Sequence, residues 1–275
     1  FDPDNLSRSL SFTDDTSHSK KGEKGTLSAS PESTNFDNGN RRITIGIPDI
    51  LDSFVIPNAT YQEIIKRIFE DKRDYSILVV EGIPGIGKST LAKYLAVDEK
   101  LESLYSDVLL FTALGATPDV SRILRNWERR LGLRVHDELS NEERIKNIRD
   151  YLHPQAALVV IDDVWNFDDG WLFAKLNNKR SLILITTRFP DVAKRLSPTE
   201  SNTIIFSELS MVEALELFAY HAPEVAKNYR NNVENLLTVQ GRLPLTVKLS
   251  ASLLNKDYKS GSDIIQRFEN LITHI

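Results

Sequence analysis

The sequence predicts an α/β fold in which a parallel five-stranded sheet is covered by helices on both faces, followed by a small all-helical region. Short apolar runs alternate with segments whose apolar residues recur at helical spacing. The runs are apolar at nearly every position, as is typical of strands buried on both faces of a sheet. After Ser207 only helical patterns continue, so the last part of the chain is expected to be a separate helical domain.

Five runs of β-forming residues are expected to be the strands of the sheet: 76–80, 107–112, 157–161, 181–185 and 203–206. Apolar residues three and four positions apart predict helices between them, at 60–69, from about 87 to 95, at 118–131 and from 141 to 152. The last of these begins behind a capping box, formed by Ser140 and Glu143. The alternation predicts strand–helix–strand units, whose strands are parallel.

The two ends of the chain differ from this central pattern. Residues 1–42 are rich in Ser, Thr, Asp, Asn and Gly, so they are expected to be disordered. They are interpreted as a linker or tail, with a signalling segment or the end of an upstream module as the alternative. Ile43, Ile45 and Ile47 then alternate as in a strand. We expect an α/β domain at 43–206 and a helical domain at 207–275.

The helical domain has its own start signals. Ser210 and Glu213 form a second capping box. Further helices are expected at 229–240, 244–255 and 262–273, and Pro244 suits the first turn of one of them. Four helices are therefore predicted in this region.

Composition excludes several classes of function. The 275 residues contain no cysteine, which excludes disulfides, thiolate metal sites and a cysteine nucleophile, and fits a reducing, cytoplasmic setting. The net charge is −5 and no strong basic patch is visible, so no nucleic-acid partner is expected. No apolar run is long enough to span a membrane and no secretory signal is visible, so no membrane partner is expected either.

The first strand leads into Gly82–Ser89, which fits the phosphate-binding P-loop pattern G-x-x-x-x-G-K-[ST]. Glycines give the loop backbone angles and close approaches that a Cβ would block, here Gly82, Gly85 and Gly87. The loop N–H groups and the positive end of the following helix then face one point, where an anion would bind. The alternative is a glycine-rich turn that binds nothing.

Within this loop, side chains add specific contacts. Lys88 is expected to contact the β- and γ-phosphates of a nucleotide, and the Ser89 hydroxyl to ligate Mg²⁺. Ile86 and Thr90 belong to the same loop and are counted among the binding residues.

Polar residues also end two later strands. Asp162 and Asp163 follow 157–161 in a Walker B pattern, where Asp162 would hold Mg²⁺ and Asp163 would orient an attacking water. Many strong P-loop ATPases have glutamate at the position of Asp163. Because the aspartate side chain is one methylene shorter, it would position water less well, which favours slow hydrolysis. Arg188 ends the strand at 181–185, where its guanidinium would sense a γ-phosphate. The alternative interpretation of Asp162 and Asp163 is a polar strand end, and that of Arg188 is a surface arginine. Trp165 is interpreted as a packing residue.

Four stretches together resemble the NB-ARC class of STAND nucleotide switches, found in plant NLR immune receptors, apoptosome scaffolds and related fungal and bacterial proteins. They are Gly82–Thr90, Leu158–Trp165, Leu182–Arg188 and Gly241–Leu245. The resemblance covers about residues 50–255 and implies a P-loop NTPase three-layer sandwich followed by an ARC1-like helical domain.

The resemblance implies further roles. Pro244 would pack on the nucleotide base, Arg188 would sense the γ-phosphate, and backbone near Val55 would meet adenine. The resting state would hold ADP, and exchange for ATP would permit homo-oligomerisation in a signalling protein of the innate immune or cell-death type.

Two departures from the family pattern follow. The stretch after Val55 lacks the usual arginine, and the 275 residues contain neither the family's winged-helix domain with its Met-His-Asp motif nor sensor repeats. Nucleotide is therefore expected to be held less firmly than in the full architecture. The competing functions are a P-loop small-molecule kinase and an AAA-type ATPase or regulator.

Overall fold

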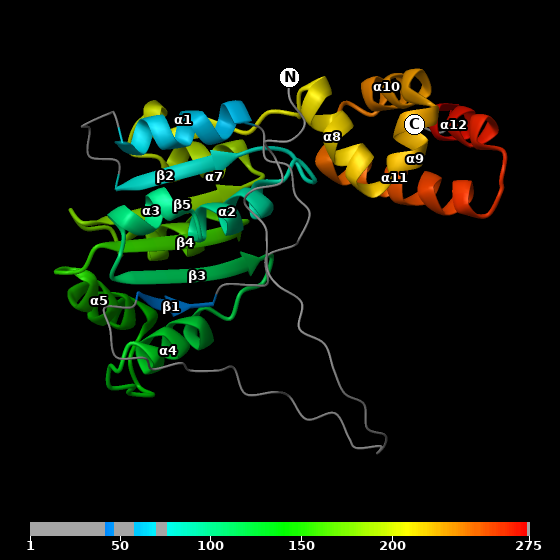
Figure 1. The fold of residues 1–275 in the computed structure, drawn as a ribbon. Helices are drawn as coiled ribbons and strands as arrows, with labels where there is room; N and C mark the ends of the chain where they lie inside the picture. The colour runs from blue at the N-terminus through cyan, green and yellow to red at the C-terminus, as the bar shows by residue number, and fades with distance from the viewer. Residues whose placement is uncertain (1–41, 47–57, 70–75, 274–275) are drawn as a thin grey trace, which may run out of the picture. The chain divides into compact units, whose positions relative to one another are not determined.

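The computed structural model describes residues 42–46, 58–69 and 76–273 (Figure 1). The predicted disordered segment lies outside these residues except for Arg42. This arginine is half-buried and donates a hydrogen bond from its guanidinium to the carbonyl oxygen of Ala96, at 3.1 Å. Ile47 also lies outside the described residues.

The described residues form one parallel sheet in the order β1-β3-β4-β5-β2-β6. Its strands are β1 (Ile43–Ile45), β2 (Ile77–Glu81), β3 (Val108–Gly115), β4 (Ala157–Val164), β5 (Ser181–Thr187) and β6 (Thr203–Ile205). All five expected strands are present, and the alternating isoleucines near the start add β1 as a sixth, beside β3. Ile43 and Ile45 are two positions apart and point to the same face of the sheet, where Ile45 is buried and Ile43, at the start of the strand, is exposed.

Alternate residues of the four central strands, β2 to β5, enter two separate hydrophobic cores, one on each face of the sheet. One core lies under α1 (Asn58–Phe69), α2 (Lys88–Ala96) and α3 (Glu99–Leu104). The other lies under α4 (Val120–Arg130), α5 (Asn141–Leu152), α6 (Phe167–Ala174) and α7 (Pro190–Leu196). The predicted three-layer α/β sandwich is therefore confirmed (Figure 1).

Three of these helices carry no long apolar pattern and were not expected from the sequence: α3, α6 and α7. Each spans eight residues or fewer, too short for helical periodicity to show. Local signals define their starts instead, namely side-chain caps for α3 and α6 and Pro190 in the first turn of α7. The Asp98 carboxylate accepts hydrogen bonds from two N–H groups of α3, and the Asn166 side chain accepts one from Asp169 in α6. The expected capping box at Ser140 and Glu143 is present at α5.

The residues after β6 are helical, as expected, and share a third hydrophobic core. They form α8 (Met211–His221), α9 (Pro223–Asn228), α10 (Arg230–Val239), α11 (Pro244–Lys259) and α12 (Ile264–Thr273). The capping box at Ser210 and Glu213 starts α8. Five helices replace the four predicted, because the short α9 begins at Pro223, a residue suited to the first helical turn.

The sheet order brings together the ends of strands that are distant in the sequence. Strand β5 lies between β2 and β4, and all three run in the same direction, so their carboxyl ends share one edge. The Gly82 N–H donates to the carbonyl oxygen of Thr187 at 3.3 Å, which joins the glycine loop to the end of β5. Ligands of parallel α/β sheets bind at this edge.

No helix in the described part of the chain is both long and apolar enough to cross a lipid bilayer.

Candidate functional site

The glycine loop after β2 has the backbone that its sequence predicts. Gly85 and Gly87 have φ angles of 79° and 106°, which side chains disfavour, and Gly87 is the residue before the first turn of α2. A Cβ on Gly82 would lie 3.1 Å from the Cβ of Phe206 and from Ile86. The loop is thus closely packed at Gly82, and it leads directly into the N-terminus of α2, where backbone N–H groups favour an anion.

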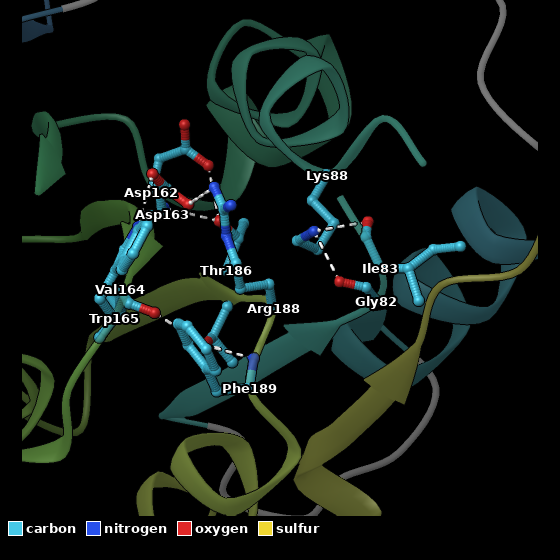
Figure 2. A network of polar contacts seen from close by, with 11 residues as sticks. Gly82, Ile83, Lys88, Asp162, Asp163, Val164, Trp165, Thr186, Arg188 and Phe189 are labelled. Carbon is cyan, nitrogen blue, oxygen red and sulfur yellow. Dashed lines mark hydrogen bonds and ion pairs between the residues drawn. The ribbon is translucent and has the colours of Figure 1, made fainter. Parts of the chain in front are cut away.

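Lys88 points into this loop (Figure 2). Its side chain is only 7% exposed, and its Nζ donates hydrogen bonds to the carbonyl oxygens of Gly82, at 2.7 Å, and Ile83, at 3.0 Å. Burial lowers the pKa of Lys88, and the positive charge of Arg188 lowers it further. A bound phosphate would counter both effects, so the site fits an anion beside Lys88.

Asp162 is buried on β4 and is oriented by the neighbouring strand. The Thr186 hydroxyl donates to Asp162 Oδ1 at 2.6 Å and accepts from the Asp163 N–H at 2.9 Å. Thr186 is 1% exposed, so these two contacts are shielded from water. A carboxylate held in this way is a suitable hard oxygen ligand for Mg²⁺.

Asp163 stands at an irregularity of β4 and has a φ angle of 53°. The pairing of β4 with β5 shifts register between Ile161 and Val164, which turns the Asp163 side chain out of the strand pattern. Its Oδ1 accepts from Arg188 at 2.8 Å, and its Oδ2 accepts from the Trp165 indole N–H at 2.9 Å. Aspartate tolerates this left-handed backbone better than most residues.

Arg188, directly after β5, is held by two contacts. Besides the ion pair with Asp163, its guanidinium lies over the Trp165 ring, 4.5 Å from the ring centroid (Figure 2). Trp165 was interpreted from the sequence as a packing residue, but it is 36% exposed and contacts both charged side chains. Burial raises the pKa of Asp163, but the hydrogen bonds from Trp165 and Arg188 and the positive charges of Arg188 and Lys88 together hold it below its usual value.

The start of α11 lies against the glycine loop. The Leu245 N–H donates to the carbonyl oxygen of Gly85 at 3.3 Å, and a Cβ on Gly87 would lie 3.8 Å from Pro244 Cγ. Pro244 occupies the first turn of α11, where its missing N–H has no helical partner to lose. The proline expected to meet a nucleotide base is therefore beside the loop expected to hold the phosphates.

The structure brings most of the predicted site residues to one edge, while Ile86, Ser89 and Thr90 take no part in the polar contacts described above. Ser89 and Thr90 lie in the first turn of α2, where Ser89 is exposed, and Ile86 is buried under the loop. Val55 lies outside the described residues, so its contact with adenine stays a prediction.

Two contacts within the site escaped sequence reasoning. The contact of Thr186 with the two aspartates was not predicted from the sequence, and neither was the backbone contact of Leu245. Each depends on which strands or helices are neighbours, and a single sequence does not state this. The signal that was present is the polar Thr186-Thr187 pair, which ends an otherwise apolar strand.

The family model described as the NB-ARC domain matches residues 58–227, more than half of the chain. The match includes the glycine loop, both aspartates and Arg188, and it ends before Pro244.

Curated proteins from Solanum demissum are similar over much of the chain. The late blight resistance protein homolog R1B-23 is 28% identical over 231 residues, and the late blight resistance protein R1-A is 28% identical over 227. Each alignment covers 76% of this chain and 17% of the relative. The chain thus spans about a sixth of the length of these relatives.

Solved structures show weaker similarity. A signal transduction ATPase with numerous domains from Pyrococcus horikoshii, which carries a tetratricopeptide repeat sensor, is 17% identical with a TM-score of 0.48. The comparison covers 73% of this chain and 30% of that one. The PCH-2 protein of C. elegans is 13% identical with a TM-score of 0.48, covering 82% and 69% of the two chains. Similarity at these values carries no argument about function.

Proposed function

The chain belongs to the NB-ARC family, and from this membership we propose that it is the nucleotide-binding switch of a defence-signalling protein. The relatives that it matches are named as late blight resistance proteins, which supports the defence setting. In the proposed cycle the site holds ADP with Mg²⁺ at rest, and exchange for ATP permits the chain to oligomerise. The proposed location is the cytoplasm.

One observation carries the proposal: residues from three neighbouring strands and from α11 converge on the glycine loop. Lys88 interacts electrostatically with Arg188, Asp163 and Asp162, and the start of α11 meets the loop at Gly85. We propose that the loop N–H groups and Lys88 bind the α-, β- and γ-phosphates, and that Pro244 packs on the adenine base. Proteins bind Mg²⁺ at such sites through one or two side chains and the phosphates, a role proposed here for Ser89 and Asp162.

The arrangement of Asp163 supports slow hydrolysis. Both of its carboxylate oxygens already accept hydrogen bonds, from Arg188 and from Trp165. These contacts hold the pKa of Asp163 below its usual value, so its carboxylate is a weaker base toward an attacking water. Hydrolysis is therefore expected to be slow while Arg188 is paired with Asp163, which suits a switch better than a motor.

The nucleotide carried by the purified chain tests the resting state. The protein is denatured and the released nucleotide is identified and counted by chromatography. ADP close to one per chain supports the ADP-bound switch, and sedimentation with a non-hydrolysable ATP analogue should then reveal a larger species than with ADP. A chain that transfers phosphate to an acceptor from a small-molecule panel would instead support the kinase alternative.

Arg188→Ala is expected to lower the preference for ATP over ADP about tenfold. A hydrogen bond between charged groups contributes roughly 1.5–3 kcal/mol, and part of this is offset because Arg188 must leave Asp163 to reach a phosphate. ADP affinity should change little, because ADP has no γ-phosphate. Calorimetric titration with ADP and a non-hydrolysable ATP analogue measures the ratio.

Arg230→Ala is the matched control for this experiment. Arg230 also forms an ion pair, with Glu234 at 2.9 Å, but both side chains are exposed on the surface of α10. It should leave both affinities unchanged. If Arg188→Ala weakened ADP and the ATP analogue by the same factor, Arg188 would support the loop rather than sense the γ-phosphate.

Thr186→Val is expected to raise the Mg²⁺ concentration needed for half-maximal binding of the ATP analogue by about tenfold, the usual size of effect for a residue that orients a metal ligand. Valine has nearly the same shape but lacks the hydroxyl that contacts Asp162 and Asp163. Magnesium titration at fixed nucleotide measures the change. Thr186→Ser retains a hydroxyl and should stay close to the unchanged protein, and equal effects of the two variants would contradict the assignment.

A further inference from the structure

Trp165 touches both members of the charged pair that the proposed function uses. Its indole N–H donates to one oxygen of Asp163, while Arg188 contacts the other oxygen and lies over the indole ring. The three side chains therefore form a closed set of contacts, with Trp165 common to both of the charges (Figure 2). The ring is itself supported, because Phe189 meets it edge-on with centroids 5.6 Å apart.

The two kinds of contact leave the arginine free to exchange partners. A guanidinium over a ring is attracted through its flat face, so its N–H groups still point outward in its plane. The Arg188 Nε is buried and has no hydrogen-bond partner in the described part of the chain. Donors on Arg188 can thus turn from the Asp163 carboxylate to a phosphate while the cation stays on the ring.

Asp163 would also keep a partner after this exchange. The Trp165 N–H contact is to Oδ2, whereas Arg188 uses Oδ1. When Arg188 leaves, the carboxylate is released on one oxygen and still held on the other. A buried or half-buried carboxylate without any donor would oppose the exchange.

We propose that Trp165 is a positioning residue that holds Arg188 within reach of the terminal phosphate, so that the aromatic face of Trp165 sets the preference for nucleoside triphosphate over diphosphate. This rests on the proposed function of Arg188 as the γ-phosphate sensor. Without the aromatic face, the long arginine side chain loses a contact that restricts it, and the entropy cost of reaching the phosphate increases.

The test measures affinities of the full chain for ADP and for a non-hydrolysable ATP analogue by calorimetry. Trp165→Ala is expected to lower the preference for the triphosphate at least threefold, with ADP affinity and the midpoint of thermal unfolding little changed. Trp165→Phe retains an aromatic face and should keep most of the preference. If Trp165→Ala does not fold, Trp165→Leu keeps apolar bulk without an aromatic face and carries the same expectation.

Matched variants separate the possible failures. Trp171→Ala removes an exposed tryptophan that stacks on Phe167, away from Arg188, and should change nothing. In an Arg188→Ala background, Trp165→Ala should have no further effect. An unchanged or increased preference in Trp165→Ala, or equal losses in the Phe and Ala variants, overturns the inference while the Arg188 result stands. No effect of Arg188→Ala itself would overturn the proposed sensor and this inference together.

Discussion

Lys88→Arg is expected to weaken binding of both ADP and ATP about 100-fold, since the contact between an ammonium and phosphate oxygens is worth roughly 1.5–3 kcal/mol. Lys88 is buried within the loop and its Nζ lies between the Gly82 and Ile83 carbonyls. A planar guanidinium is larger and directs its donors differently, so it cannot replace a compact ammonium in this space. The positive charge is retained, and the loss therefore reports geometry rather than net charge.

The fold is expected to survive this change. The loop backbone depends on Gly85 and Gly87, and α2 on its own hydrogen bonds and apolar face. Calorimetric titration with both nucleotides measures the affinity, and circular dichroism with thermal unfolding monitors the fold. Lys66→Arg, an exposed change on α1, is the control. Normal nucleotide binding by a folded Lys88→Arg protein would disprove the site assignment.

The sequence predicted those parts of the site whose chemistry requires particular residue types close together in the chain. The glycine loop and its flanking strand and helix could be predicted because a phosphate-binding loop needs those residues at that spacing. Strand β2 and helix α2 are present where expected. Asp162 and Arg188 could be read as strand ends because a parallel sheet buries its strands and leaves their carboxyl ends polar.

The remaining contacts depend on which elements are neighbours. Thr186 meets Asp162 because β5 lies between β4 and β2, and no local pattern states that order. The position of Trp165 follows from the register shift and positive φ at Asp163, which a sequence pattern for a regular strand does not predict. The short helices follow from local start signals and tertiary packing rather than from periodicity: α3 and α6 have side-chain caps, and α7 begins at a proline.

The second large effect is expected at a buried ion pair that no sequence pattern indicated. Glu128 in α4 and Arg144 in α5 form a salt bridge with both side chains at 0% exposure. Arg144 also donates to the carbonyl oxygens of His136 and Asp137, in the segment between the two helices. The pair thus fixes α5 and the segment before it against α4, on one face of the sheet that carries the site.

Arg144→Met is expected to lower the free energy of unfolding by about 3–5 kcal/mol, because it leaves the Glu128 carboxylate buried without a counter-charge. Glu128→Leu combined with Arg144→Met should recover most of this loss, since an apolar pair of similar volume needs no compensation for removing charges from water. Equilibrium unfolding in urea measures both variants, with Arg149→Met, an exposed change on the same helix, as control. A single variant as stable as the control would show that water reaches the pair. A double variant as unstable as the single one would show that the hydrogen bonds of Arg144 to the interhelical segment, rather than the charge of Glu128, dominate the effect.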